Sequence, residues 1–160
     1  MTDAVLSIGS NIGNSRGYLV AAVDQLGESV RAVSSVYRTP PWGGVEQGDF
    51  LNAVVLVGDE DVNDPHEWLR SCQQLEQSAA RTRTVRWGPR TLDADVVAVG
   101  DLRLNDDVLT LPHPRAHQRA FVLLPWSELD PAAELAGYGP IAKLLQQLDL
   151  SGISRLGKLR

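Results

Sequence analysis

The alternation of apolar and polar residues predicts that the chain folds into short strands and amphipathic helices. Apolar runs bounded by glycine, proline or asparagine predict four strands, at residues 4–8, 30–37, 50–57 and 93–99. Apolar residues at helical spacing predict a helix that begins near Ser15 and ends at Gly27. A second helix is expected to begin with Asp64 as its N-cap and Pro65 in its first position. This order of elements is that of a ferredoxin-like α+β fold (βαββαβ), an antiparallel sheet with helices packed on one face.

Residues beyond position 100 give weaker signals, which indicate C-terminal additions to this core. We expect a hairpin or edge strand within Leu102–Leu111, a short helix around Phe121–Leu124, and a last helix that begins at Pro140. The length of 160 residues and the composition, 43% hydrophobic and 22% charged, suit a single domain spanning residues 1–160. Because no run approaches the ~20 apolar residues of a membrane span and Cys72 is the only cysteine, we expect a cytoplasmic protein.

The charged residues are unevenly distributed along the chain. The net charge of −5 disfavours general attraction to nucleic acid or to an anionic membrane. Thirteen of the 15 basic residues are arginine, however, and seven of these lie between Arg81 and Arg119. Codon bias can explain the overall excess of arginine. The clustering suits recognition of phosphate, whose oxygens match the planar guanidinium fork.

Two acids follow the densest part of this cluster. Asp93 and Asp95 occupy positions i and i+2 of a predicted strand, so their carboxylates project from the same side. Two such carboxylates repel each other unless a cation lies between them, and oxygen ligands suit Mg²⁺ that is bound together with substrate phosphates. The alternative is a set of salt bridges with the preceding arginines, Arg83, Arg86 or Arg90. The spacing alone is compatible with both.

Three further features are weaker candidates. Phe50 and Asn52 share a strand face and offer a ring and an amide to a flat heterocycle, although an aromatic core residue beside a turn-forming asparagine explains the pair as well. His113 lies between two prolines and shortly before Arg119, with no second His or Cys at metal-ligand spacing, so zinc is not expected. The segment GSNIG, residues 9–13, lacks the Lys-Ser/Thr of a P-loop, and a tight strand-to-helix turn explains its glycines.

In their order along the chain, these segments resemble one family closely, the hydroxymethyl-dihydropterin pyrophosphokinases of folate synthesis. The matching segments are IGSN (8–11), SSVYRTPPWG (34–43), QGDFLNAVV (47–55), RWGPRTLDADVV (86–97) and LPHPRAHQRAFVLLPWSEL (111–129). The combination of WGPRTLDxD with PHPxxxxRxFVLxP is highly specific. The resemblance implies a ferredoxin-like enzyme that transfers the β,γ-pyrophosphate of ATP to the hydroxymethyl oxygen of the pterin and releases AMP.

The resemblance also assigns roles to individual residues. The catalytic group would be Arg81, Arg90, Asp93 and Asp95, and the two acids would hold two Mg²⁺ ions. The residues implied to bind the pterin are Thr39, Pro40, Trp42, Phe50, Asn52, Trp87 and Phe121. The residues implied to bind ATP are Glu76, Arg81, Arg83, Trp87, Arg90, His113 and Arg119. We expect a monomer that acts on these small molecules and binds neither nucleic acid nor membrane.

Two other functions are compatible with parts of the sequence. A ferredoxin-like sheet with exposed aromatic residues can bind single-stranded RNA, but the net acidity and the lack of an RNP-like aromatic strand argue against such a module. A two-metal phosphodiester hydrolase needs a positioned water and usually more acidic ligands. Cleavage of ATP only in the presence of a pterin acceptor would separate the transferase from both.

Overall fold

A computed structural model describes residues 2–40, 48–79 and 91–159. The strands of the main sheet are β1 (Thr2–Ser10), β2 (Val30–Val33), β3 (Ser35–Thr39), β4 (Phe50–Asp59), β5 (Asp93–Val99) and β10 (Ser154–Lys158). Within the described residues they form a six-stranded sheet in the order β10-β3-β4-β1-β5, with β2 also paired to β4. All these pairings are antiparallel. The predicted combination of helices with an antiparallel sheet is therefore confirmed.

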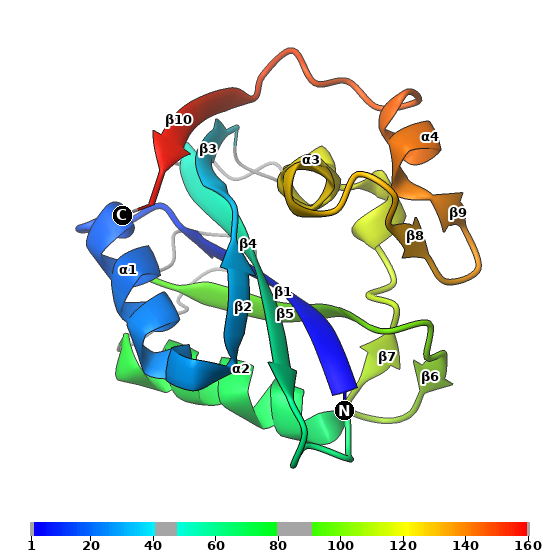
Figure 1. Ribbon diagram of the computed structural model, residues 1–160. Coiled ribbons are helices and arrows are strands. Elements are labelled where there is room, and N and C mark those ends of the chain that lie inside the picture. Colours follow the sequence, from blue (N-terminus) through cyan, green and yellow to red (C-terminus); the bar gives the residue numbers. More distant parts are fainter. Residues whose placement is uncertain (1, 41–47, 80–90, 160) are drawn as a thin grey trace.

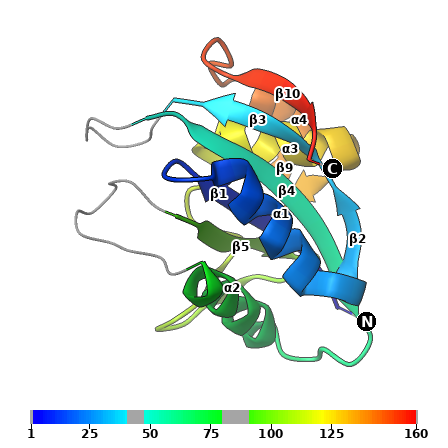
Figure 2. The same cartoon turned by 90° about the vertical axis from the view of Figure 1, so that its left-hand side faces the viewer.

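Helices α1 (Ser15–Leu26) and α2 (His66–Ser78) cover one face of this sheet, and they lie in front of it in Figure 2. Both helices contribute to one buried apolar cluster with the strands; its largest helical members are Leu19, Val23, Trp68 and Leu75. Helix α1 ends as predicted at Gly27, whose φ of 58° is readily adopted only by glycine. The two predicted core helices are thus confirmed.

The start of α2 differs from the prediction by one residue. The helix begins at His66, and Pro65 is its N-cap in place of Asp64. Asp64 still serves the helix end, because its Oδ1 accepts a 3.0 Å hydrogen bond from the backbone N–H of His66. The predicted N-cap position is therefore wrong by one residue, although the side chain of Asp64 does accept a backbone N–H at the start of the helix.

Helices α3 (Ala120–Leu129) and α4 (Ile141–Leu145) lie on the opposite face of the sheet (Figure 1). They close a second apolar cluster, which includes Val54, Val97, Leu123, Trp126, Leu135 and Ile141. Helix α3 is longer than the predicted segment around Phe121–Leu124, and α4 is a short helix that stops at Leu145. The expectation of helices on one face holds for α1 and α2 only, because the C-terminal additions cover the other face.

The strand predicted at residues 30–37 is two strands, because the chain is interrupted at Ser34. Strand β2 pairs with β4 up to Val33↔Val55, whereas β3 resumes at Tyr37↔Asn52, so one extra residue lies on this side. Ser34 is buried, and its Oγ accepts a 2.9 Å hydrogen bond from the N–H of Val54. The valine-rich pattern continues across the bulge, which is why the sequence predicted one strand.

Several C-terminal elements complete the description. The predicted hairpin within 102–111 is confirmed as β6 (Leu104–Asn105) with β7 (Thr110–Leu111). Strand β10 and the short pair β8 (Glu134–Leu135) and β9 (Gly139–Pro140) were not predicted. Four of the five residues of β10, SRLGK, are exposed, so the strand lacks the apolar alternation that would have revealed it. Among the helices of the described residues, none has the length and apolar character needed to cross a membrane.

Candidate active site

Residues from four strands form a row across one end of the sheet. Tyr37 on β3 pairs with Asn52 on β4. Asn52 pairs in turn with Gly9 on β1, and Gly9 pairs with Asp93 on β5. Their chain neighbours belong to the core on the α1–α2 side, so strand alternation places the row on the α3 face; these neighbours are Val36, Ala53, Ile8 and Ala94. The row joins the predicted pterin residue Asn52 to the predicted metal residue Asp93, two strand spacings or roughly 10 Å apart.

Asn52 is held in one orientation within this row. Its Nδ2 donates a 2.6 Å hydrogen bond to Oγ1 of Thr39, and both residues are buried. Its Oδ1 lies beside Gly9, where a Cβ would approach to 2.6 Å. Phe50 lies two residues earlier on β4, pairs with Thr39 and is half-buried. Three of the predicted pterin residues therefore lie together on adjoining strands.

The two acids of β5 lie at the other end of the row. Asp93 and Asp95 are half-buried, whereas Ala94 between them is 6% exposed and packs in the core of the α1–α2 side. Oδ2 of Asp95 lies 4.0 Å from Nη1 of Arg119, a residue that is itself buried. The strand pleat thus presents both carboxylates on the α3 face, as the spacing predicted.

Arg119 enters this region because it is the N-cap residue of α3. Its guanidinium carbon lies 5.5 Å from the ring centroid of Phe121, within the range of a cation–π contact. Phe121 is partly buried and packs against the apolar cluster under α3. One helix start therefore brings a positive charge to Asp95 and an aromatic ring to the same face.

His113 is held just before this helix. Its backbone N–H donates a 2.8 Å bond to the carbonyl oxygen of Val97, and its Nδ1 accepts a 3.1 Å bond from the N–H of Arg115. Burial, and next the charge of Arg119, lower the pKa of His113 from 6.5 to about 4. The imidazole is therefore neutral near pH 7 with its proton on Nε2, so that nitrogen can donate to an anionic ligand.

Glu76 reaches the same strand from the opposite face. Its Oε2 accepts a 3.0 Å hydrogen bond from the backbone N–H of Ala94, the residue between the two acids. Cys72 lies one turn earlier on α2 and is buried. Burial, together with the negative charges of Asp95, Glu76 and Asp93, raises the pKa of the Cys72 thiol, so it stays protonated and unreactive. In the structure, Glu76 supports the backbone of β5.

Sequence analysis missed Glu128, which connects α3 to the edge of the sheet. Its Oε2 accepts bonds from the N–H (2.9 Å) and Oγ (3.2 Å) of Ser35, and its Oε1 accepts a 2.6 Å bond from the hydroxyl of Tyr37. Nε of Arg155 on β10 lies 3.7 Å from Oε1. The residue lies within the PWSEL segment, but only the folded arrangement of α3 over β3 reveals its partners.

Five predicted site residues lie outside the described residues, so the structure does not place them. They are Trp42, Arg81, Arg83, Trp87 and Arg90. Pro40 is described and lies exposed directly after β3. The described part of the site therefore consists of the sheet row, the acids of β5 and the start of α3.

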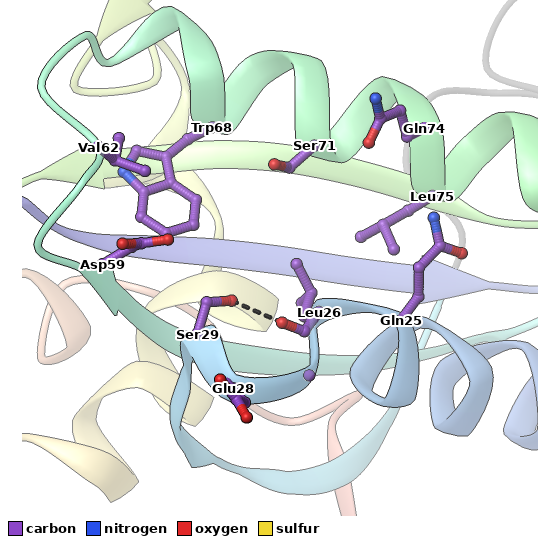
Figure 3. A pocket seen from close by; sticks show the side chains of 11 residues that line it. Gln25, Leu26, Glu28, Ser29, Asp59, Val62, Trp68, Ser71, Gln74 and Leu75 are labelled. Atoms are coloured by element: carbon purple, nitrogen blue, oxygen red, sulfur yellow. Dashed lines mark hydrogen bonds between the residues drawn. The ribbon is translucent and has the colours of Figure 1, made fainter.

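A cavity of about 450 Å³ lies elsewhere, between the end of α1 and one side of α2 (Figure 3). Gln25 and Leu26 face Gln74 and Leu75 across it. None of the predicted site residues lines it. This cavity lies on the α1–α2 side of the sheet, whereas the row lies on the α3 face, so the candidate site is separate from it.

The donor set of the row suits a hard cation that is shared with a ligand. Among the described residues, no group of three or more His, Cys, Asp or Glu side chains could hold a metal ion. Asp93 and Asp95 supply carboxylate oxygens only, and Mg²⁺ commonly takes one or two carboxylates and completes its shell with water and phosphate. The residues present therefore fit a magnesium ion that binds with a nucleotide.

A small α+β fold that combines paired carboxylates, a buried arginine, an amide and aromatic side chains on one sheet face suits phosphoryl transfer to a flat acceptor. The family model described as 7,8-dihydro-6-hydroxymethylpterin-pyrophosphokinase (HPPK) matches residues 5–131. The chain belongs to this family.

Individual relatives agree with this family match. The chain is 46% identical to the 2-amino-4-hydroxy-6-hydroxymethyldihydropteridine pyrophosphokinase of Mycobacterium tuberculosis, covering 93% of this chain and 85% of that protein. It is 42% identical to the protein of the same name from Methylorubrum extorquens, covering 98% and 99%. The resemblance noted in the sequence is thus confirmed.

Solved structures support the fold. A Plasmodium falciparum HPPK-DHPS structure with a triple mutation and STZ-DHP superposes with a TM-score of 0.70 at 15% identity, over 91% of this chain and 43% of that chain. The wild-type HPPK-DHPS with pterin and p-hydroxybenzoate gives a TM-score of 0.69 at 16% identity, over 91% and 43%. The chain spans less than half the length of these solved chains, and at this identity the likeness concerns the fold alone.

Proposed function

We propose that this protein transfers pyrophosphate from ATP to the hydroxymethyl group of 6-hydroxymethyl-7,8-dihydropterin, giving AMP and the pterin pyrophosphate in folate biosynthesis. The observation that carries the proposal is the row Asn52, Gly9, Asp93 on the α3 face, in a chain of the HPPK family. An amide that can read a heterocycle and a carboxylate that can hold a metal lie at the two ends of one short path across the sheet.

The reaction is a direct transfer between two bound substrates. The hydroxymethyl oxygen forms a bond to the β-phosphorus of ATP, and the bond from that phosphorus to the oxygen bridging the α- and β-phosphates breaks. The departing oxygen leaves on AMP, and the acceptor hydroxyl loses its proton. Because no covalent enzyme intermediate is needed, the protein contributes chiefly by holding the two substrates in line and by stabilising charge on the phosphates.

The pterin is proposed to lie against β3 and β4. Phe50 and Phe121 offer two ring faces, and Asn52 offers its amide to the polar edge of the heterocycle. The orientation of Asn52, fixed by its 2.6 Å bond to Thr39, supports this role because a fixed amide recognises one arrangement of donors and acceptors. The proposed pterin residues remain Thr39, Pro40, Trp42, Phe50, Asn52, Trp87 and Phe121.

ATP is proposed to lie nearer β5 and the start of α3. Arg119 beside Asp95 and the neutral donor of His113 support this placement. The proposed ATP residues remain Glu76, Arg81, Arg83, Trp87, Arg90, His113 and Arg119, with Arg81 and Arg90 acting on the transferred group. Glu76 would act through the backbone of β5, since its carboxylate accepts the N–H of Ala94.

Asp93 and Asp95 would hold Mg²⁺, and we propose two ions. A metal held by these two carboxylates would supply positive charge that offsets the negative charge developing on the phosphates. Arg119 stands 4.0 Å from Asp95 and limits the mutual repulsion of the two acids.

The finer description of the molecule is part of the same proposal. The strand order β3-β4-β1-β5, with α1 and α2 on one face, supports a ferredoxin-like core within a single domain of residues 1–160. We propose that it acts as a cytoplasmic monomer on small molecules, with no nucleic-acid or membrane partner.

Chromatographic separation of AMP and pterin pyrophosphate tests the function directly. With Mg²⁺, ATP and hydroxymethyl-dihydropterin, AMP and pterin pyrophosphate should appear in equal amounts. Little AMP should form when the pterin is left out. ATP cleavage that is independent of the pterin would support a hydrolase, and RNA binding without either product would support the ferredoxin-like RNA-binding alternative.

A further inference from the structure

We infer that Gly9 is a positioning residue for acceptor recognition: its missing side chain leaves the space that the Asn52 carboxamide occupies. The inference rests on the proposed function. It replaces the explanation drawn from the sequence, in which a strand-to-helix turn required the glycines of residues 9–13. Gly9 lies inside β1 and pairs on both sides, with Asn52 and with Asp93.

The backbone of Gly9 gives no reason for a glycine. Its φ lies outside the left-handed region, whereas Gly13, at the turn itself, has a φ of 70°. A glycine within a strand loses more conformational freedom on folding than alanine and offers no side chain to pack. A steric cause is therefore needed for Gly9.

Asn52 supplies that cause. A Cβ on Gly9 would lie 2.6 Å from Oδ1 of Asn52 and 3.6 Å from its Cγ. The amide has no easy way to withdraw, because Asn52 is 4% exposed and its Nδ2 is bonded to Thr39, which is 2% exposed. Turning Oδ1 away from an added methyl group would break the 2.6 Å bond to Thr39 or force a shift of β1 against β4.

The position of Gly9 also explains why this contact concerns the acceptor. In the row across the sheet it stands between Asn52, the proposed reader of the pterin, and Asp93, the proposed holder of the metal. We therefore assign to Gly9 the placement of the Asn52 amide.

Calorimetry on four forms of the protein tests this inference: the parent, Gly9→Ala, Asn52→Ala and the double variant. Each is titrated first with α,β-methylene-ATP and Mg²⁺, and then, when saturated, with the pterin. Gly9→Ala should weaken pterin binding roughly 10- to 100-fold, as expected for a buried hydrogen-bonding group left unmatched. The affinity for the nucleotide analogue should stay within about twofold, since the nucleotide contacts are not displaced.

The double variant gives the decisive comparison. If Gly9 acts by making room for Asn52, then adding Gly9→Ala to Asn52→Ala should cost little further pterin affinity, because the clash has been removed. Losses that add in full, or an equal loss of nucleotide affinity in Gly9→Ala, would overturn the inference. If Gly9→Ala alone fails to fold, the double variant should fold again, and its failure to do so would equally count against the steric cause.

Gly58→Ala is the matched control. Gly58 lies on the same β1–β4 ladder at its far end. A Cβ there would meet the carboxylate of Asp3 and, at 2.9 Å, Nε of Arg31, but both are exposed side chains that can move aside. This variant should bind the pterin like the parent protein. Absence of pterin binding by the parent would contradict the proposed function, whereas normal binding by both parent and Gly9→Ala would contradict only the role of Gly9.

Discussion

At the scale of single residues, the strand pleat decides which side chains can act together. Asp93 and Asp95 project on the α3 face while Ala94 is buried against the helices on the other side. Substituting Ala94 would therefore affect packing, and substituting either acid would affect the site.

Asp95→Asn tests the role of the acids. The amide has nearly the shape of the carboxylate but is a poor ligand for a hard cation. We expect kcat to fall at least about 100-fold, or roughly 3 kcal/mol, which is the size of effect seen when one electrostatic group at a reaction centre is removed. The melting temperature should change little, because Asp95 is only half-buried and asparagine keeps nearly the same side-chain shape.

Asp101→Asn makes the same charge change at an exposed position just after β5 and serves as the control. Steady-state assays over a range of Mg²⁺ concentrations measure both variants. If Asp95→Asn turns over like Asp101→Asn at every Mg²⁺ concentration, the metal assignment fails.

The site residues that sequence patterns could predict are those whose proposed role follows from local spacing. Same-side spacing along a strand identified Asp93 with Asp95, and Phe50 with Asn52. Gly9 and Glu128 escaped because their partners lie on other elements: Asn52 across the β1–β4 ladder, and Ser35 and Tyr37 across the α3–β3 contact. Patterns in a single sequence carry no information about which residues from distant segments of the chain come into contact.

At the scale of elements, Glu128 fixes how α3 sits on the sheet. Burial on its own would raise the pKa of Glu128, but hydrogen bonds from Tyr37 and Ser35 and the charge of Arg155 outweigh it and lower that pKa. Burial, and next the bond to Glu128, raise the pKa of Tyr37 to about 12. This connection sets the distance between Phe121 on α3 and the row that ends at Tyr37.

Glu128→Ala should lower the free energy of unfolding by about 1–3 kcal/mol, because it leaves the buried N–H and hydroxyl of Ser35 without their acceptor. Tyr37→Phe removes one bond to the same carboxylate and should cost less. Urea unfolding measures both, with Glu134→Ala, at an exposed position on β8, as a control for loss of a carboxylate.

The pH dependence follows from the lowered pKa of Glu128. The unfolded chain binds the proton first, so the stabilisation is complete above the ordinary pKa of 4.5 and is lost as the pH falls below it. A loss in Glu128→Ala no larger than in Glu134→Ala, or the same loss at pH 7 and well below pH 4, would contradict this account.

The elements that sequence patterns described less well are those stabilised mainly by their neighbours. Strand β10 pairs with β3 although four of its five residues are exposed. Its end is held by Nη2 of Arg16, which donates to the carbonyl oxygens of Lys158 and Leu159 at 2.6 and 2.8 Å. The break between β2 and β3 arises from one extra residue opposite β4. Neither strand β10 nor the break between β2 and β3 leaves a signal in the pattern of apolar residues from which the elements were predicted.

At the scale of the whole molecule, the two faces of the sheet have different roles. The face under α1 and α2 holds the larger apolar cluster, and the face under α3 and α4 holds a smaller one that leaves the end of the sheet to the site. On that end, the residues proposed to bind the acceptor lie toward β3 and β4, and those proposed to bind the nucleotide lie toward β5. Gly9 lies between the two groups.

Separate binding of the two substrates measures this division most directly. In calorimetry with Mg²⁺ and α,β-methylene-ATP, followed by pterin at saturating analogue, Asn52→Ala should weaken the pterin roughly 10- to 100-fold and leave the analogue within about twofold. Arg119→Ala should do the reverse, weakening the analogue at least about tenfold through the loss of a buried charge near the phosphates. If both substitutions weaken both ligands equally, or if Asn52→Ala affects the nucleotide and spares the pterin, the proposed layout of the site is wrong.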